Sequence, residues 1–311
     1  MKLIKGREIA DKILREVSGG IGAERLIPGL GVVLVGNDQA SKIYVGLKEK
    51  AARDVGVNFF KAEFDSDEDE KNILKKIEKF NADEKVHGII VQLPLPKKFD
   101  TQKIINSISP KKDVDGFCPE NIEKFLKGFG NIFPVFPGAI MAMIESVAET
   151  KHRSNFAEKR KGVVVCNSDI FGKIMVEALR RKGIKGEYVL VKELREGKEK
   201  KGEEEREREK GEEIKIGMEE KNGLMKFEKL KETDVLVSAC GISNFIISEM
   251  VKDGAIVIDG GITKIDGKVV GDVDFESVKN RDIFLSPVPG GVGPMTVAML
   301  IKNVWLLSKN K

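Results

Sequence analysis

The sequence predicts an α/β protein with two domains. At 311 residues, the chain is long enough to form two domains that each bury a core of their own. In both halves of the chain, short apolar runs rich in β-branched residues alternate with longer stretches of helical periodicity. Strands and helices that alternate in this way are typical of a parallel sheet covered by helices, so we expect a layered α/β domain in each half.

Composition narrows the function classes. Charged residues make up 33% of the chain but the net charge is only +4, which is not the pattern of a nucleic-acid-binding protein. The cysteines (Cys118, Cys166 and Cys240) and the histidines (His87 and His152) are scattered, so we expect neither a disulfide framework nor a metal site. Because no stretch approaches a membrane span, we expect a soluble, cytoplasmic protein without a membrane partner.

The first half of the chain predicts strands and helices in alternation. Residues 29–36 (GLGVVLVG) are apolar and bounded by glycines, which indicates a buried strand. Ser41 is the expected N-cap of the helix that follows. The predicted helices cover residues 7–17, 41–55 and 68–80, and the predicted strands cover residues 29–36, 57–64 and 86–91.

The second half begins as a strand–helix–strand unit and has a Rossmann-like order. Its predicted strands cover residues 162–166, 188–191, 234–239, 255–259 and 283–285, and its predicted helices cover residues 139–150, 172–182 and 295–307. We expect a linker over residues 151–161. Residues 192–221 are almost entirely charged and lack an apolar stripe, so we predict a solvated helix or a disordered segment, with partner binding as the alternative.

Tyr44 and Lys48 are the first candidate functional residues. Their spacing places a phenol beside an amine on one face of the predicted helix. A lysine held near a phenol and away from water can have a lowered pKa and act as a general acid or base. Gln92 directly follows the strand predicted to end at residue 91. Ligands gather at the carboxyl ends of parallel strands, so the three side chains can meet at one site.

Two further segments carry candidate ligand-binding groups. Asp113 and Asp115 alternate in a DVDG turn, where either carboxylate could cap the turn or bind a ligand. Residues 287–296 (PVPGGVGPMT) combine glycines, which let a ligand approach the backbone, with prolines, which stiffen the loop.

The chain contains four motifs: YxxxK at residues 44–48, VQLPLP at 91–96, PKKDVDGF at 110–117 and PVPGGVGPMT at 287–296. Together they resemble the methylenetetrahydrofolate dehydrogenase/methenyltetrahydrofolate cyclohydrolase family. The resemblance implies oxidation of 5,10-methylenetetrahydrofolate with NAD(P) and hydrolysis of the methenyl product to 10-formyltetrahydrofolate. It implies a folate-binding catalytic domain (residues 1–132 and 293–311), to which the last helix returns, and a Rossmann-like NAD(P)-binding domain (residues 133–292) with 192–221 as an insertion. It also implies a homodimer.

The resemblance assigns roles residue by residue. Lys48, Tyr44 and Gln92 are the expected catalytic residues, and Asp115 is expected to hold the amino-bearing edge of the pterin with two parallel hydrogen bonds. The expected substrate contacts are Tyr44, Lys48, Val91, Gln92, Leu93, Asp115, Pro289, Gly290, Gly291 and Gly293.

The expected cofactor site departs from the family pattern GRSxIVGxP. Ser168, Ile170 and Gly172 fit it, but Cys166 replaces the first glycine and Asn167 replaces the arginine that pairs with the 2′-phosphate of NADP. The resemblance implies NADP, whereas Asn167 and Glu193 leave NAD open. The expected cofactor contacts are Cys166, Asn167, Ser168, Ile170, Gly172, Glu193 and Ile262. A cyclohydrolase with a decayed dinucleotide site and a non-catalytic folate-binding or scaffold protein remain the alternatives.

Overall fold

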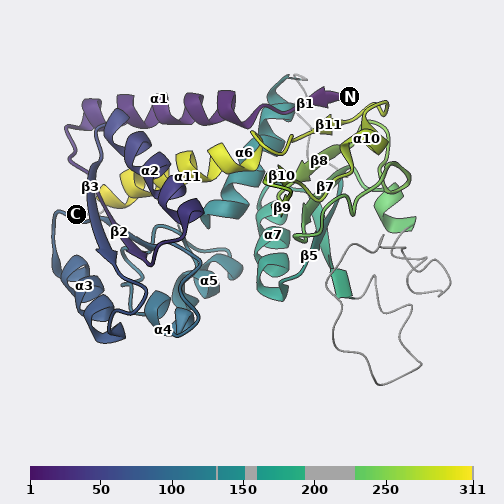
Figure 1. Cartoon of the computed structure of the whole chain (residues 1–311). Helices are drawn as coiled ribbons and strands as arrows, with labels where there is room; N and C mark the ends of the chain where they lie inside the picture. The colour runs from purple at the N-terminus through teal and green to yellow at the C-terminus, as the bar shows by residue number, and fades with distance from the viewer. Residues whose placement is uncertain (131, 151–159, 193–227, 310–311) are drawn as a thin grey trace, which may run out of the picture. The chain divides into compact units, whose positions relative to one another are not determined.

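The computed structural model describes residues 1–130, 132–150, 160–192 and 228–309. The chain forms two compact units, which we name by their main sheets (Figure 1). The three-stranded unit contains Gly6–Ala139 and Gly293–Lys311, and the six-stranded unit contains Met1–Lys5 and Ile140–Val292. Both main sheets are parallel, as the sequence predicted. Across the described ranges, every helix is too short or too polar to span a bilayer.

The sheet of the three-stranded unit has the order β3-β2-β4. Its central strand β2 (Gly29–Val35) is buried along its whole length, which explains an apolar sequence without alternation. β3 (Asn58–Phe64) and β4 (Gly88–Val91) flank it. The helices of this unit are α1 (Gly6–Glu24), α2 (Gln39–Asp54), α3 (Glu70–Ala82), α4 (Thr101–Asn106), α5 (Pro119–Leu126) and, apart from its first residue, α11 (Val292–Ser308).

The start of α2 differs from the prediction. Asp38, not Ser41, is the N-cap, and its carboxylate accepts a hydrogen bond from the Ser41 backbone N–H at 2.7 Å. The earlier start places Ser41 in the first turn, where its side chain is buried. Tyr44 and Lys48 therefore lie in the second and third turns of the helix.

The prediction that the last helix packs on the first domain is confirmed (Figure 1). Trp305 of α11 donates its indole N–H to Glu24 of α1 at 3.3 Å. A Cβ at Gly20 would overlap the Trp305 ring, so a glycine is needed where the two helices meet. This contact also explains why α1 continues seven residues beyond the predicted end at residue 17 and through three glycines.

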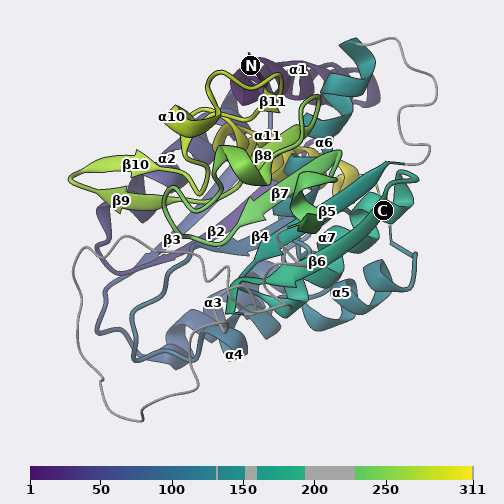
Figure 2. The ribbon, with the colours of Figure 1, turned by 90° about the vertical axis from the view of Figure 1, so that its right-hand side faces the viewer.

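The main sheet of the other unit has the order β1-β11-β8-β7-β5-β6, and β5, β6 and β7 lie side by side in Figure 2. The Rossmann-like prediction is confirmed by this parallel sheet. Its strands are β1 (Lys2–Leu3), β5 (Lys161–Cys166), β6 (Lys185–Leu190), β7 (Val235–Ala239), β8 (Ile256–Asp259) and β11 (Phe284–Leu285). The unit also contains α7 (Asp169–Arg181), α10 (Phe275–Val278), the hairpin of β9 (Thr263–Ile265) and β10 (Lys268–Val270), and α6 (Val135–Thr150) from Ile140 onward.

The first five residues pack differently from the expected domain division. The Lys2 backbone N–H donates to the Ile283 carbonyl at 2.7 Å, and Ile4 donates to Leu285 at 2.8 Å. These residues therefore belong to the six-stranded unit by contact, whereas the sequence analysis placed them in the first domain. A strand of two residues is too short to show a hydrophobic period. Nearly all of the expected linker (151–161) and of the charged run (192–221) lies outside the described residues.

Candidate active site

Lys48 and Gln92 meet at the carboxyl edge of the three-stranded sheet. The Lys48 ammonium Nζ donates to Gln92 Oε1 at 2.8 Å. Gln92 directly follows β4, and its backbone N–H extends the ladder by donating to the Val33 carbonyl at 2.8 Å. Its side-chain Nε2 donates to the Leu93 carbonyl at 2.6 Å, which fixes the amide with its oxygen toward Lys48. The Leu93–Pro94 peptide bond that follows is cis.

Lys48 is a lysine whose charge is destabilised. Burial lowers the pKa of its ammonium group, and the neighbouring Asp115 carboxylate opposes this effect by a smaller amount. The side chain is only half-buried, so Nζ can still reach a ligand or a water molecule. A lysine with a lowered pKa and a fixed amide partner is suited to act as a general acid or base.

The structure separates the two aspartates of the DVDG turn. Asp113 is buried and accepts three hydrogen bonds, from the backbone N–H groups of Gly116 (3.0 Å) and Cys118 (2.8 Å) and from the Asn121 amide (3.0 Å). It therefore caps the turn. Asp115 lies close enough to Lys48 for their charges to interact, and it is the carboxylate of the pair that remains available to a ligand.

The Asp115 carboxylate reaches solvent, but protein atoms crowd around it. The loss of surrounding water raises the pKa of Asp115 to about 6, the Lys48 charge lowers it, and the Asp113 charge raises it. Lys48 and Asp115 thus place one basic and one acidic group, both with shifted pKa values, at the same site. Such pairs are typical of sites that move protons.

Large apolar side chains stay exposed beside these polar groups. Tyr44 and Leu93 are 36% and 44% exposed, and Ile43 and Leu47 on α2 are 64% and 44% exposed. Ile43 and Leu47 form the helical stripe next to the one that carries Tyr44 and Lys48. An exposed apolar surface around a few polar groups is typical of a ligand site. Sequence reasoning missed Ile43 and Leu47, although their spacing of four on a half-polar helix was a usable signal.

The glycine loop between β11 and α11 has a constrained backbone. Gly290 has a φ of +99°, and a Cβ at Gly291 would come within 2.5 Å of the Pro287 carbonyl oxygen. Pro289, Gly290 and Gly291 belong to the six-stranded unit and Gly293 to the three-stranded unit. Their role in substrate binding stays a prediction, as does that of Val91, which is buried at the end of β4.

Five of the expected cofactor residues, Cys166, Asn167, Ser168, Ile170 and Gly172, lie at the carboxyl end of β5 and the start of α7, whereas Ile262 follows β8. Ser168 is the N-cap of α7, and its hydroxyl accepts a hydrogen bond from Phe171 N–H at 3.3 Å. Asn167 donates its amide to the Cys240 carbonyl at 3.1 Å, across to the end of β7. Gly172 leaves space that the Tyr188 ring fills, because a Cβ there would approach the ring to 2.5 Å. Cys166 is buried, and its thiol lies 3.3 Å from the Ser168 carbonyl.

These residues fit a nicotinamide dinucleotide. The helix N-terminus of α7 follows a parallel strand, which is the place where a pyrophosphate binds in such sheets. Ile170 and Ile262 are 46% and 56% exposed, and their part in cofactor binding stays a prediction. Glu193 lies outside the described residues.

Two buried aspartates that sequence reasoning missed organise the neighbouring loops. Asp272 accepts hydrogen bonds from the Ser238 hydroxyl (2.8 Å) and from the backbone N–H groups of Cys240 (2.6 Å) and Ile242 (2.9 Å). Asp259 accepts bonds from the backbone N–H groups of Gly261, Asp272 and Val273, at 2.9 to 3.0 Å. Burial raises the pKa of Asp259 to about 6. The two carboxylates tie together the loops that follow β7 and β8.

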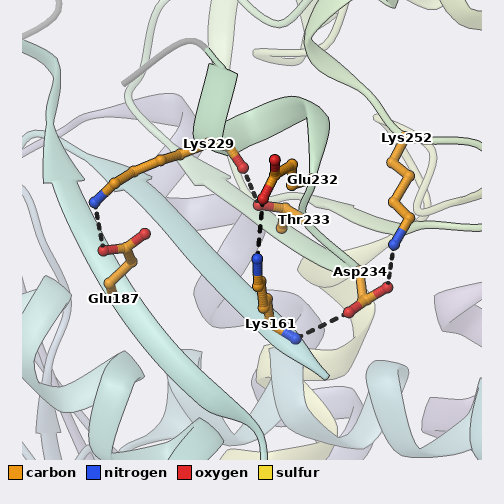
Figure 3. Close-up of polar contacts among 7 residues, drawn as sticks. All are labelled: Lys161, Glu187, Lys229, Glu232, Thr233, Asp234 and Lys252. Atoms are coloured by element: carbon orange, nitrogen blue, oxygen red, sulfur yellow. Dashed lines mark hydrogen bonds and ion pairs between the residues drawn. The ribbon is translucent and has the colours of Figure 1, made fainter. Parts of the chain in front are cut away.

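A hollow of about 280 Å³ lies elsewhere in the six-stranded unit, at the amino ends of β5 and β6. Its charged side chains pair with one another and with neighbours (Figure 3): Lys161 with Glu232 at 2.9 Å, Lys229 with Glu187 at 3.0 Å, and Lys252 with Asp234 at 2.8 Å. The Lys161 backbone N–H also donates to Asp234 at 2.9 Å. These pairs are largely solvated and join the strand starts, so we read them as structural.

Comparison with known proteins identifies the family of this chain. Residues 4–115 match the family model of the tetrahydrofolate dehydrogenase/cyclohydrolase catalytic domain, and residues 216–311 match that of its NAD(P)-binding domain. A relative from Exiguobacterium sp. named "Bifunctional protein FolD" is 37% identical, with 97% of this chain and 96% of the relative covered.

Solved structures agree with these matches. The bifunctional FolD enzyme of Campylobacter jejuni superposes with a TM-score of 0.82 at 31% identity, covering 100% of this chain and 99% of that one. The Trypanosoma brucei FolD protein, solved with NADP and an inhibitor, gives a TM-score of 0.80 at 28% identity and covers 99% and 97% of the two chains. The chain therefore belongs to the tetrahydrofolate dehydrogenase/cyclohydrolase family.

Proposed function

We propose that this protein oxidises 5,10-methylenetetrahydrofolate to 5,10-methenyltetrahydrofolate with NAD(P) and hydrolyses the methenyl product to 10-formyltetrahydrofolate. The observation that carries the proposal is the hydrogen bond from Lys48 to Gln92, made beside the Asp115 carboxylate and an exposed apolar rim. The family membership and the bifunctional relatives support both activities.

The folate would bind to the three-stranded unit. Asp115 accepts two parallel hydrogen bonds from the amino-bearing edge of the pterin. Tyr44 stacks on the substrate or hydrogen-bonds to it, and the apolar rim covers the rest of the flat ring system. These contacts hold the reacting carbon near Lys48, which is catalysis by positioning.

Hydrolysis then needs a proton to leave the attacking water and a proton to reach the ring nitrogen, and Lys48 is placed to make both transfers. As water adds to the methenyl carbon, the new C–O bond forms and the lysine accepts one of the two water protons. The bond from that carbon to one ring nitrogen breaks, the lysine returns its proton to this nitrogen, and the hydroxyl loses its remaining proton to solvent as the formyl C=O forms. The reaction consumes one water and releases one proton overall. Gln92 holds the lysine in place through the 2.8 Å hydrogen bond.

The six-stranded unit would hold the dinucleotide. Ser168 and Gly172 shape the turn and helix N-terminus for the pyrophosphate, and Ile170 and Ile262 provide apolar surface. A bound nicotinamide supplies the hydride acceptor for the oxidation. The Asn167 amide is neutral and already donates to Cys240, so it offers no cation to a 2′-phosphate, and both NAD and NADP remain candidates. We further propose a homodimer in the cytoplasm, as the family resemblance implies.

The absorbance of the methenyl species tests this function. Formation of that species from 5,10-methylenetetrahydrofolate with NAD or NADP supports the dehydrogenase, and its decay faster than in buffer supports the hydrolase. Hydrolysis without hydride transfer would leave a cyclohydrolase alone, and neither activity would leave a non-catalytic folate-binding protein.

The variant Lys48→Met tests whether methenyl hydrolysis depends on Lys48. It should slow hydrolysis by about a hundredfold or more, because a general acid–base group is lost. Lys42→Met is the matched control, since Lys42 lies on the same helix, is exposed, and its side-chain ammonium donates to Asn37 at 3.1 Å, away from Gln92. Near-normal turnover by the Lys48 variant would remove this residue from the mechanism.

A further inference from the structure

Asn303 is a buried polar residue for which the proposed chemistry has no role. It lies on α11 and is 1% exposed. Its amide Nδ2 donates to the Val114 carbonyl and to the Phe133 carbonyl, each at 2.9 Å. A primary amide nitrogen carries two hydrogens, so these bonds use both. Val114 is the residue between Asp113 and Asp115.

The backbone around Asp115 is held from several other elements. Ile89 of β4 donates its N–H to the Lys112 carbonyl at 2.7 Å, and Val135 donates to the Asp115 carbonyl at 3.0 Å. The Val114 side chain packs on Gly88 so closely that a Cβ at Gly88 would overlap it. The Asp113 carboxylate closes the turn from within. Among the hydrogen bonds of the described residues, the one from Asn303 ties this turn to the C-terminal helix.

We propose that Asn303 is a positioning residue that aims the Asp115 carboxylate at the pterin. This inference rests on the proposed function, and Asn303 acts through Asp115 without touching the substrate. A carboxylate that accepts two parallel N–H···O bonds must be held at a defined angle. Loss of the Asn303 amide would remove this donor from the buried Val114 carbonyl, and the turn would shift to recover a hydrogen bond.

A double-mutant cycle on kcat/KM for methenyl hydrolysis tests the proposal. Asn303→Leu keeps the branched shape and removes the donors, and Asp115→Asn keeps the shape and removes the charge. Each single variant should lower kcat/KM by about tenfold or more, mainly through KM. If Asn303 acts through Asp115, the double variant should be no worse than Asp115→Asn alone. Effects that multiply in the double variant would overturn the proposal.

Two controls separate positioning from stability. Ser308→Ala removes a buried hydroxyl from the same helix, where it donates to the Trp305 carbonyl at 2.7 Å, and it should lower the melting temperature without changing KM. Asn303→Ala leaves room for water to satisfy the two carbonyls, so it provides a folded variant if Asn303→Leu does not fold.

The outcomes distinguish a failure of the proposed function from a failure of the proposed role of Asn303. A wild-type protein without hydrolase activity would refute the proposed function. A wild-type protein that is active, with Asn303 variants that melt lower but keep the wild-type KM, would refute the role of Asn303 alone. The dissociation constant for NAD(P), measured on the same proteins, should stay unchanged in every Asn303 variant.

Discussion

At the scale of single residues, neighbouring identical groups have different roles. Asp113 and Asp115 are separated by one residue, and their sequence context does not say which one caps the turn. The structure decides this, because Asp113 accepts three hydrogen bonds while no donor in the described ranges reaches the Asp115 carboxylate. The proposed catalytic role of Lys48 likewise depends on its hydrogen bond to Gln92 and not on its spacing from Tyr44 alone.

The raised pKa of Asp115 predicts a pH dependence. With a pKa of about 6 in the folded protein, the carboxyl is mostly protonated below this pH and cannot accept both pterin hydrogen bonds. We therefore expect kcat/KM for methenyl hydrolysis to rise as the pH increases through about 6. A pH–rate profile checks this. Asp115→Asn should lack this rise, and the same rise in that variant would assign the titration to another group.

At the scale of elements, local patterns predicted the helices and strands that have strong periodicity. The sequence predicted β2, α2 and α7 because a buried strand shows an apolar run and a half-buried helix shows an apolar stripe. The short helices α4 and α5 have only six and eight residues and were missed. α1 was cut short at its glycines, because the Trp305 ring that makes Gly20 necessary lies 285 positions further along the chain.

The loops after β7 and β8 also depend on long-range contacts that local sequence patterns do not reveal. Asp272 accepts two backbone N–H bonds and one hydroxyl bond from the end of β7, and no local pattern signals these contacts. Asp272→Asn would turn an amide N–H₂ toward one set of these donors and loosen the loop. Dinucleotides bind at the carboxyl edge of such sheets, so we expect the dissociation constant for NAD(P) to rise by about tenfold.

Calorimetric titration with NAD and NADP measures this change. Methenyl hydrolysis should stay within about twofold of wild type, because the Lys48 site lies in the other unit. Asp253→Asn is the matched control, since Asp253 is 66% exposed and pairs with Arg281 at 2.8 Å in the same unit. Unchanged nucleotide affinity in the Asp272 variant would mean that the loops do not contribute to binding.

At the scale of the whole molecule, the path of the chain decides what each unit needs to fold. Residues 1–5 supply an edge strand to the six-stranded unit, and residues 293–311 supply α11 to the three-stranded unit. Family resemblance predicted the return of the last helix, but periodicity could not, because an apolar helix does not reveal which surface it covers. The contacts of Asn303 and Trp305 place Val114, Phe133 and Glu24 of α1 on that surface.

This dependence predicts that residues 6–139 do not fold without α11. The fragment would expose the surface around Gly20 and remove the Asn303 hydrogen bond from the buried Val114 carbonyl. Adding a peptide of residues 293–311 should restore a cooperative thermal transition in circular dichroism. Trp305 is the only tryptophan in the chain, so its emission in the peptide should shift to the blue as the ring becomes buried. A Val304→Asp peptide should fail in both measurements, because Val304 is fully buried. A cooperative transition in the fragment alone would show that the three-stranded sheet and its own helices form a sufficient core.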